Sequence, residues 1–381
     1  MKGDQSGDSL SYVKSLTDSY TALHDNVTFE IQSISASESL RDGLQSGDNG
    51  ASPDLIWMVD DFITPFAAAD QIMPVDSLVD GARFVPAARQ ALSVDGVLWG
   101  APVSIGNQLM LYWNKELAGD APPENSAAWI TKAKELTSDG RFGISYNETD
   151  SFWLVPFLEG YGGSVFGDDG QTPTLDTDAM RSALKFLYDL KFTAKVTPPD
   201  ADYDVADALF REGNSAYVIN GDWTLDAYAA PLAAQSPGLG GNLGVSPLPT
   251  LIGGGNPRPY IVASFVMVPA AVGNDQNVKA IVADFLDFAT NRDNQVKMLK
   301  SLGRIPANAE ALQDPAVSGD PVRAGVAAAA QLGVPQPAST EMRCVFDAMT
   351  EGMHTMFGGS DDFAAISAAM QSAAQTCISS L

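Results

Sequence analysis

Residues 216–225 read AYVINGDWTL and carry a strand pattern directly to a large aromatic residue. The apolar residues 217–219 form a short strand pattern that ends at Asn-Gly-Asp (220–222), a typical turn sequence. Trp223 follows directly, and a turn is a poor place to bury a large ring in a core. We therefore expect the turn to display Trp223 at a surface, with Gly221 supplying a positive φ at no steric cost.

Strand patterns and helical patterns alternate on both sides of this stretch. PDLIWMV at 53–59 is a continuous apolar run, as in buried parallel strands, and VTFEIQSI at 27–34 alternates apolar and polar residues. LMLYWN at 109–114 reads as a further strand, and from about residue 276 the chain is helical almost throughout. This alternation predicts an α/β fold with largely parallel sheets and a helical C-terminal segment.

The composition restricts the classes of function. The chain has 381 residues, enough for two or three domains, and 47 acidic against 22 basic residues give it a net charge of −25. Such a charge repels nucleic acids and anionic lipids, whereas it suits a neutral or cationic ligand. The cysteines Cys344 and Cys377 fit one disulfide between the last two helices, which we expect, although two buried thiols fit the count about as well.

Several kinds of site have no signal in the sequence. The two histidines, His24 and His354, and the lack of a Cys-x-x-Cys motif leave no convincing zinc or haem site, so no cofactor is expected. No apolar run approaches the roughly 20 residues of a membrane span. The start, MKGDQSGDS, lacks the apolar region of a signal peptide, which predicts either a cytoplasmic protein or one whose leader has been removed.

Six segments, in order along essentially the whole chain, carry a more specific signal. They are GDQSGDSLSYV (3–13), PDLIWMVDDF (53–62), GAPVSIGNQLMLYWNKEL (100–117), YNETDSFWLVPFLEGYGG (146–163), AYVINGDWTL (216–225) and LGRIPANAEA (302–311). Together they resemble the maltose-binding-protein family, the extracytoplasmic solute-binding proteins of ABC sugar importers. Each segment alone is weak, but six in register are specific for the family, though not for the sugar.

The resemblance implies a two-lobed periplasmic-binding-protein fold, type II-like, that closes on its ligand as a Venus flytrap. It assigns residues 1–107 and 263–305 to lobe 1, and residues 108–262 and 306–381 to lobe 2. The family also has a strand before the segment that begins at Gly3. Since only two residues stand there in this sequence, the resemblance implies that lobe 1 lacks a strand that is usually central.

A sugar presents hydroxyl groups around its rim and C–H bonds on its faces. Its site therefore needs carboxylates or amides in the ring plane and aromatic rings above or below it. The resemblance places Trp223 where the family has a stacking Trp in its second lobe. The alternative is a ring packed on its own lobe.

In lobe 1 the resemblance points to the end of the strand at 53–59 and to the first loop. Trp57 aligns with an aromatic residue of the cleft, but a core position fits it nearly as well. Asp60 aligns with a carboxylate of the family, and Asp61 replaces a basic residue. In the first loop, Asp4 aligns with an acid, and Gln5 replaces a Lys.

The remaining candidate residues depart further from the family pattern. Asn107 stands where the family has Glu, Asp150 aligns with a Glu, and Phe152 aligns with a Tyr that stacks on sugar. Trp153 could supplement that ring or belong to the core of its helix. Arg343 could reach the cleft, although an exposed helical Arg is the alternative. So many changes in one pocket argue against assuming maltose.

These observations predict an extracytoplasmic receptor, in the periplasm or anchored at the cell surface, that delivers a disaccharide or oligosaccharide to the permease of an ABC importer. A maltodextrin-like α-glucoside is favoured. We expect a monomer that binds no nucleic acid and is not an enzyme. The alternatives are the same scaffold with a polyamine, a glycosidase that uses two cleft carboxylates, and a structural or adhesion protein.

Overall fold

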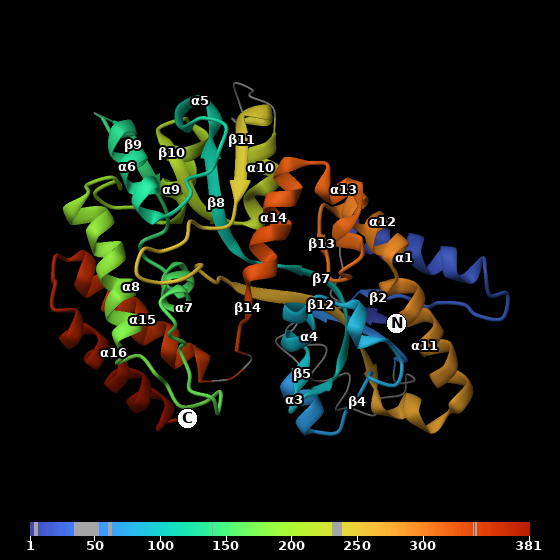
Figure 1. Ribbon diagram of the computed structural model, residues 1–381. Helices are drawn as coiled ribbons and strands as arrows, with labels where there is room; N and C mark the ends of the chain where they lie inside the picture. The colour runs from blue at the N-terminus through green and yellow to red at the C-terminus, as the bar shows by residue number, and fades with distance from the viewer. Residues whose placement is uncertain are drawn as a thin grey trace. The chain divides into compact units, whose positions relative to one another are not determined.

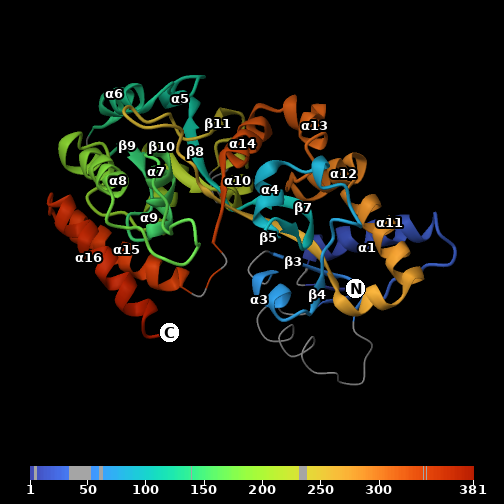
Figure 2. The same ribbon diagram turned by 60° about the horizontal axis from the view of Figure 1, so that its bottom comes forward.

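The computed structural model of the protein describes residues 1–3, 7–33, 53–59, 63–138, 140–230, 238–337, 339 and 341–381. The chain forms two compact units, one from residues 1–106 and 261–320, the other from residues 107–260 and 321–381. Residues 306–320, which the sequence-based division assigns to lobe 2, belong to the first unit. Each unit combines a sheet with helices (Figures 1 and 2).

The first unit is built on a mixed sheet with the strand order β13-β7-β12-β3-β1-β2. The strands are β13 (Ile305–Pro306), β7 (Gly100–Gly106), β12 (Tyr260–Pro269), β3 (Ile56–Val59), β1 (Lys2–Gly3) and β2 (Gln32–Ser33), and β4 (Ile72–Met73) pairs with the end of β12. β12 is antiparallel to β7 and β3, whereas β1 is parallel to β3 and β2. The expectation that lobe 1 lacks a strand is therefore wrong, because Lys2–Gly3 forms a short one inside the sheet.

Helices of the first unit lie beside this sheet, where α1, α11 and α12 pack together (Figure 1). The helices are α1 (Gly7–Thr21), α3 (Ile63–Ala68), η2 (Gly81–Arg83), α4 (Pro86–Ala91), η7 (Ala270–Asn274), α11 (Gln276–Thr290), α12 (Arg292–Leu302), η8 (Ala311–Gln313) and α13 (Pro315–Ser318), and β5 (Ser93–Val94) forms a hairpin with β6 (Val97–Leu98). α11 begins where the Asp275 carboxylate accepts two backbone N–H groups, and α12 ends at Gly303, whose φ is 69°.

The strand expected at 27–34 is present only as Gln32–Ser33. Residues 27–31 keep the alternation of a strand, with Val27, Phe29 and Ile31 half-buried and Thr28 and Glu30 exposed. A strand also requires a partner, and the neighbouring strand β1 covers only two residues. The alternation of apolar and polar residues therefore holds along residues 27–31, but the hydrogen-bonded ladder extends only as far as the two residues of β1.

The second unit contains a four-stranded sheet with the order β11-β8-β10-β9. Its strands are β11 (Leu243–Ser246), β8 (Leu109–Asn114), β10 (Ser215–Gly221) and β9 (Phe142–Ser145). β8 is antiparallel to β10 and β11, and β10 is parallel to β9. β10 therefore has a partner on both sides, and all seven of its residues are buried.

Helices and short segments of the second unit surround this sheet. They are α5 (Lys115–Ala118), α6 (Ser126–Leu136), η3 (Ser151–Trp153), α7 (Val155–Gly160), α8 (Asp178–Tyr188), η4 (Asp189–Thr193), α9 (Tyr203–Arg211), η5 (Asp222–Thr224), α10 (Leu225–Ala229), η6 (Gly240–Asn242), α14 (Pro321–Leu332), α15 (Met342–Phe357) and α16 (Phe363–Ile378). The short strand β14 (Val334–Pro335) pairs instead with β12, and the Val334 N–H donates to the Pro259 carbonyl. Among the described residues of both units, no helix is long and apolar enough to span a membrane.

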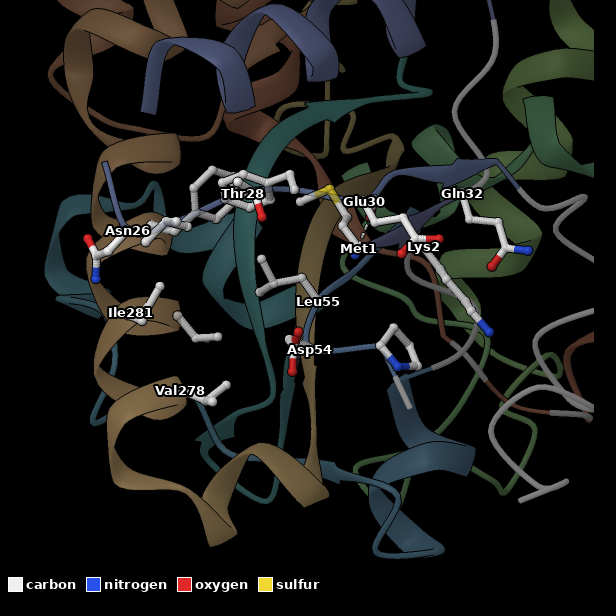
Figure 3. Close-up of a pocket in the computed structure, with 15 residues that line it drawn as sticks. Met1, Lys2, Asn26, Thr28, Glu30, Gln32, Asp54, Leu55, Val278 and Ile281 are labelled. Carbon is white, nitrogen blue, oxygen red and sulfur yellow. Dashed lines mark hydrogen bonds between the residues drawn. The ribbon is translucent and has the colours of Figure 1, made fainter. Parts of the chain in front are cut away.

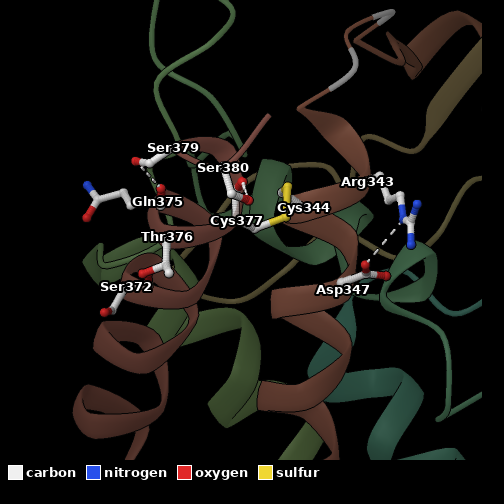
Figure 4. Close-up of a disulfide and its surroundings, with 9 residues drawn as sticks. All are labelled: Arg343, Cys344, Asp347, Ser372, Gln375, Thr376, Cys377, Ser379 and Ser380. Atoms are coloured by element: carbon white, nitrogen blue, oxygen red, sulfur yellow. Dashed lines mark hydrogen bonds and ion pairs between the residues drawn. A yellow bond between two sulfur atoms is a disulfide. The ribbon is translucent and has the colours of Figure 1, made fainter.

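The last two helices form a hairpin that packs against α8 (Figure 2). Cys344 of α15 and Cys377 of α16 are joined by a disulfide across a Cα–Cα distance of 5.6 Å (Figure 4). The pairing expected from the sequence is confirmed. Farther along the hairpin, a Cβ at Gly352 would lie 2.0 Å from Cε and 2.7 Å from Cγ of Met370, so a larger residue there would require the Met370 side chain to move.

Candidate ligand-binding site

Trp223 lies in η5, directly after the last residue of β10. Its side chain is 43% exposed, although the strand that leads to it is buried throughout. Large aromatic rings are normally well buried, so an exposed one at the end of a central strand is an unusual feature. The structure thus displays Trp223 at a surface of the second unit, as its sequence context predicts.

Gly221 is required beside Trp223, but for a different reason from the positive φ that we predicted. Its φ of −89° and ψ of 171° are those of extended backbone, and β10 runs through it, so the predicted turn at 220–222 and the positive φ are both wrong. A Cβ at Gly221 would instead lie 2.0 Å from Cζ3 of the Trp223 ring. Glycine is needed here because the indole lies directly against the backbone.

Buried hydrogen bonds hold the end of β10 in place. The carbonyl of Gly221 accepts from the Tyr112 hydroxyl at 2.8 Å and from Thr224 Oγ1 at 2.9 Å. Asn220 Nδ2 donates to the Tyr228 hydroxyl at 2.9 Å, and Asn220 Oδ1 accepts from the Gly221 N–H. Burial raises the pKa of Tyr112 well above its usual range, so its hydroxyl remains protonated and able to donate.

Tyr203 fixes the orientation of the Trp223 ring. The indole Nε1 of Trp223 donates to the Tyr203 hydroxyl at 3.0 Å. Tyr203 is the first residue of α9, and the Asp202 carboxylate caps this helix by accepting from the Val205 N–H. Sequence reasoning missed Tyr203, because the bond spans 20 positions and joins two separate elements. The signal in the sequence was an aromatic residue directly after Asp202, a residue type that caps helices.

Trp153 supports Trp223 from the side of the core. Its ring meets that of Trp223 edge-on, with centroids 6.3 Å apart, and meets Tyr203 at 6.2 Å. The Trp153 side chain is only 4% exposed, and its Nε1 donates to the carbonyl of Ile219 in β10. Of the two alternatives for Trp153, the core residue is the one that the structure shows.

Phe152 also packs against Trp223, with ring centroids 6.3 Å apart and planes inclined by 50°, and its ring lies 5.8 Å from that of Trp153. It is half-buried, and its backbone N–H donates to Oδ1 of Asp150, the residue that caps η3. The Asp150 side chain is exposed to solvent. We call Trp223, Phe152 and Tyr203 the aromatic group. It offers ring surface beside a carboxylate, and both kinds of group are needed to hold a sugar.

Asn107 begins the second unit and adopts a left-handed backbone conformation with φ of 65°. Asn tolerates this conformation better than most residues. Its backbone N–H donates to Oδ1 of Asp222 at 3.0 Å, which ties the first residue of the unit to η5. Asn107 is therefore brought to the segment that carries Trp223.

Two other candidates are not part of this group. Trp57 is 3% exposed in β3, where its Nε1 donates to Ser264 Oγ at 3.0 Å, so its core alternative is the one observed. Arg343 is 89% exposed on α15, and its Nε lies 3.7 Å from Oδ2 of Asp347 on the same helix (Figure 4). Arg343 is thus an exposed residue on a helix, which was the alternative to a position in the ligand cleft.

Four predicted site residues lie outside the described residues: Asp4, Gln5, Asp60 and Asp61. Two further aromatic residues, to which no sequence motif pointed, extend the aromatic group into the unit. Tyr260 lies 6.4 Å from Phe152, and Phe346 of α15 lies 6.4 Å from Tyr260. Within the part of the chain that the structure describes, no cluster of His, Cys, Asp or Glu could hold a metal ion.

Residues 15–325 match the family described as bacterial extracellular solute-binding protein. The chain belongs to this family. Among curated relatives, the maltotriose-binding protein of Pyrococcus abyssi (strain GE5 / Orsay) is 26% identical over 347 residues, which cover 88% of this chain and 72% of that protein. The galactooligosaccharide-binding protein of Bacillus subtilis (strain 168) is 23% identical and matches 85% of this chain and 77% of its own length.

Solved structures of solute-binding proteins share the fold. The maltose/maltodextrin-binding domain MalE from Bdellovibrio bacteriovorus, bound to maltotriose, aligns with a TM-score of 0.70 at 25% identity over 99% of this chain and 98% of that one. A cyclo/maltodextrin-binding protein complexed with maltotetraose aligns with a TM-score of 0.86 at 21% identity and covers 100% and 97% of the two chains. The predicted α/β solute-binding fold is confirmed.

Proposed function

We propose that this protein is an extracytoplasmic receptor that binds an oligosaccharide and delivers it to the permease of an ABC importer. The observation that carries the proposal is the exposed Trp223 ring, which is held in orientation by Tyr203 and flanked by Phe152. A surface ring fixed by a hydrogen bond loses little freedom when a ligand stacks on it, so its contact area stabilises the complex at low entropic cost.

The aromatic group fits a neutral sugar better than the cation of the alternative prediction. The face of an indole matches the C–H face of a pyranose, and an exposed carboxylate such as Asp150 forms strong hydrogen bonds with sugar hydroxyls. Relatives named for maltotriose and for galactooligosaccharide support an oligosaccharide ligand. Within this class we favour an α-glucoside of two or more units, such as maltotriose.

We also propose that sugar binding changes the relative position of the two units. A ligand that contacts residues of both units favours the form in which both sets of contacts are made. Asp4, Gln5, Asp60 and Asp61 are our candidates from the first unit, and Asn107 and the aromatic group from the second. Small-angle scattering should show a smaller radius of gyration with saturating sugar. An unchanged curve with sugar bound would contradict closure.

Titration calorimetry on the protein and its Trp223→Ala variant tests the site. We expect this substitution to weaken maltotriose or galactooligosaccharide binding by about 1–3 kcal/mol, the size of other aromatic stacking contributions. Leu23→Ala, which truncates an exposed apolar residue of the first unit, should leave the affinity unchanged. Unchanged sugar affinity in the Trp223→Ala variant would show that the aromatic group is not part of the sugar-binding site.

Two measurements separate the alternative functions. A thermal-shift series that includes polyamines should show stabilisation by oligosaccharides alone, and stabilisation by a polyamine alone would replace the sugar proposal. We expect maltotriose to remain intact after prolonged incubation with the protein. Release of shorter sugars would indicate a glycosidase, which needs two carboxyl groups at a fixed separation across the scissile bond.

A further inference from the structure

The hairpin of α15 and α16 is tied together at both of its ends. At one end, residues 358–362 connect the two helices. At the other end, the disulfide joins Cys344 in the first turn of α15 to Cys377 in the last turn of α16 (Figure 4). The disulfide thus holds the end of the hairpin that lies opposite the connection.

α16 contributes few buried side chains to this disulfide end. The buried residues of the helix are Ile366, Ser367, Met370 and Ala374. Of residues 375–381, Cys377 and Ile378 are half-buried and the others are exposed. A single Ala buries little apolar area, and helix ends open more readily than helix centres. The disulfide is therefore a main restraint that α16 places on the first turn of α15.

The first turns of α15 also contact η3, the segment that carries Phe152. Ser151 Oγ donates to the carbonyl of Phe346 at 3.1 Å and accepts from Thr350 Oγ1 at 3.2 Å. Ser151 is fully buried, so the loss of either hydrogen bond would leave a polar atom without water to replace the partner. Phe346 comes two residues after Cys344, so η3 is fastened to α15 beside the disulfide.

A second line of contacts leads from α15 to the ring of Phe152. The Phe346 ring lies 6.4 Å from that of Tyr260, and the Tyr260 ring lies 6.4 Å from that of Phe152. The buried Tyr260 hydroxyl has no hydrogen-bond partner in the part of the chain that the structure describes. The Tyr260 ring is therefore positioned by packing, and a displacement of Phe346 changes the support of Phe152.

We propose that the Cys344–Cys377 disulfide is a positioning element of the ligand site. It holds the first turns of α15, and these hold Phe152 against Trp223 through Ser151 and Tyr260. The inference rests on the proposed function, because the rings of Phe152 and Trp223 are the proposed sugar contacts. A ring that is already held in place loses little freedom when a ligand stacks on it, so loss of the disulfide weakens binding.

Titration calorimetry with maltotriose compares the oxidised protein with the variant Cys344→Ser/Cys377→Ser. The comparison is made at a temperature at which melting curves show both proteins to be folded. We expect the variant to bind about fivefold more weakly, the size of other couplings between neighbouring sites. Reduction of the unaltered protein with dithiothreitol should have the same effect, and it should not change the affinity of the variant. A disulfide that served stability alone would leave the affinity of the folded protein unchanged.

Ser151→Ala and Ser367→Ala provide a matched pair. Both serines are fully buried and form hydrogen bonds, but Ser367 lies on α16 and its Oγ donates to Asp176 at 2.9 Å, away from η3. Ser151→Ala should weaken sugar binding about threefold and reduce the further effect of disulfide removal to roughly twofold, because both changes act on one line of contacts. Ser367→Ala should leave the affinity unchanged and the fivefold effect intact. If the double cysteine variant does not fold, Ser151→Ala retains the test.

Amide hydrogen exchange without sugar gives a second readout. The N–H of Trp153 donates to the Asp150 carbonyl, and the N–H of Leu154 donates to the Ser151 carbonyl. Removal of the disulfide should speed exchange at these two amides, because η3 loses its support from α15. The amides of β10, which is paired on both sides, should exchange as before.

These measurements separate failure of the inference from failure of the proposed function. Sugar affinity that is independent of the disulfide in the folded protein would overturn the inference, and so would unchanged exchange at Trp153 and Leu154. Absence of sugar binding by the oxidised, unaltered protein would instead overturn the proposed function. Exchange at the two amides would then still decide whether the disulfide positions η3.

Discussion

β10 and β1 occupy equivalent places in the two sheets, yet they differ in length. β10 lies between β8 and β9, has seven residues and is buried throughout. β1 lies between β3 and β2 and has two residues, and the segment 27–31 beside it has a strand pattern without a ladder. The comparison shows that an apolar alternation forms a strand only as far as a partner extends.

The largest effect should come from equivalent truncations in the two regions. Ile219→Ala removes a fully buried side chain from β10 and should lower the free energy of unfolding by about 2–5 kcal/mol. Val27→Ala truncates a half-buried side chain of the segment 27–31 and should cost less than about 1 kcal/mol, because Val27 already borders an open groove (Figure 3). Urea melts of both variants measure the difference. Equal losses would mean that the segment 27–31 is packed like a paired strand.

The second prediction concerns the covalent link, which lies in the second unit. Cys344→Ser with Cys377→Ser opens a loop that spans 33 positions. Removal of a disulfide of this size should lower the free energy of unfolding by about 2–4 kcal/mol. Reduction of the unaltered protein should have a similar effect on its urea melt, whereas it should not change the double variant. A reductant effect of the same size in both proteins would place the loss elsewhere.

A smaller effect is expected where β10 ends. Gly221→Ala adds a Cβ that would meet the Trp223 ring, so the ring must move away from its Tyr203 hydrogen bond. We expect stability to fall by about 1–3 kcal/mol, as for other overpacked sites, and sugar affinity to fall roughly tenfold. Gly241→Ala, with no atom within 4 Å of its Cβ and no positive φ, adds the same methyl group without a clash and should leave sugar affinity unchanged. Calorimetry and urea melts together test both expectations.

The smallest effect concerns a turn that needs no partner strand. The Thr172 hydroxyl donates to Oδ2 of Asp169, and the N–H groups of Thr172 and Gln171 donate to its Oδ1. These bonds lower the pKa of Asp169 to about 2. A carboxyl with a depressed pKa stabilises the fold above its unfolded pKa of 3.8 and loses this contribution as the pH falls toward 2. Asp169→Asn should therefore lose less stability between pH 4 and pH 2 than the unaltered protein. Parallel stability curves would show that the turn is not coupled to folding.

The candidate site shows how far local reasoning reaches. The exposure of Trp223 could be predicted, because a polar Asn-Gly-Asp stretch after an apolar run signals the end of a strand. The role of Gly221 could not be predicted. A positive φ and the close approach of a ring both require glycine, and the sequence alone does not distinguish the two reasons. Trp57 and Trp153 are buried, and for both residues the sequence left the core and the ligand alternatives open.

The alternation of strands and helices and the six segments of the family could be identified from the residues alone, which also indicated the disulfide and the exposure of Trp223. These features depend on residue types at short spacings, or on a pair of cysteines with no other partner. Only the folded chain shows which rings join Trp223, that Lys2–Gly3 lies inside a sheet, and that among the described residues the segment 27–31 is not part of a strand. Each of these is a pairing between segments far apart in the chain, and such pairings depend on the packing of the whole unit rather than on local periodicity.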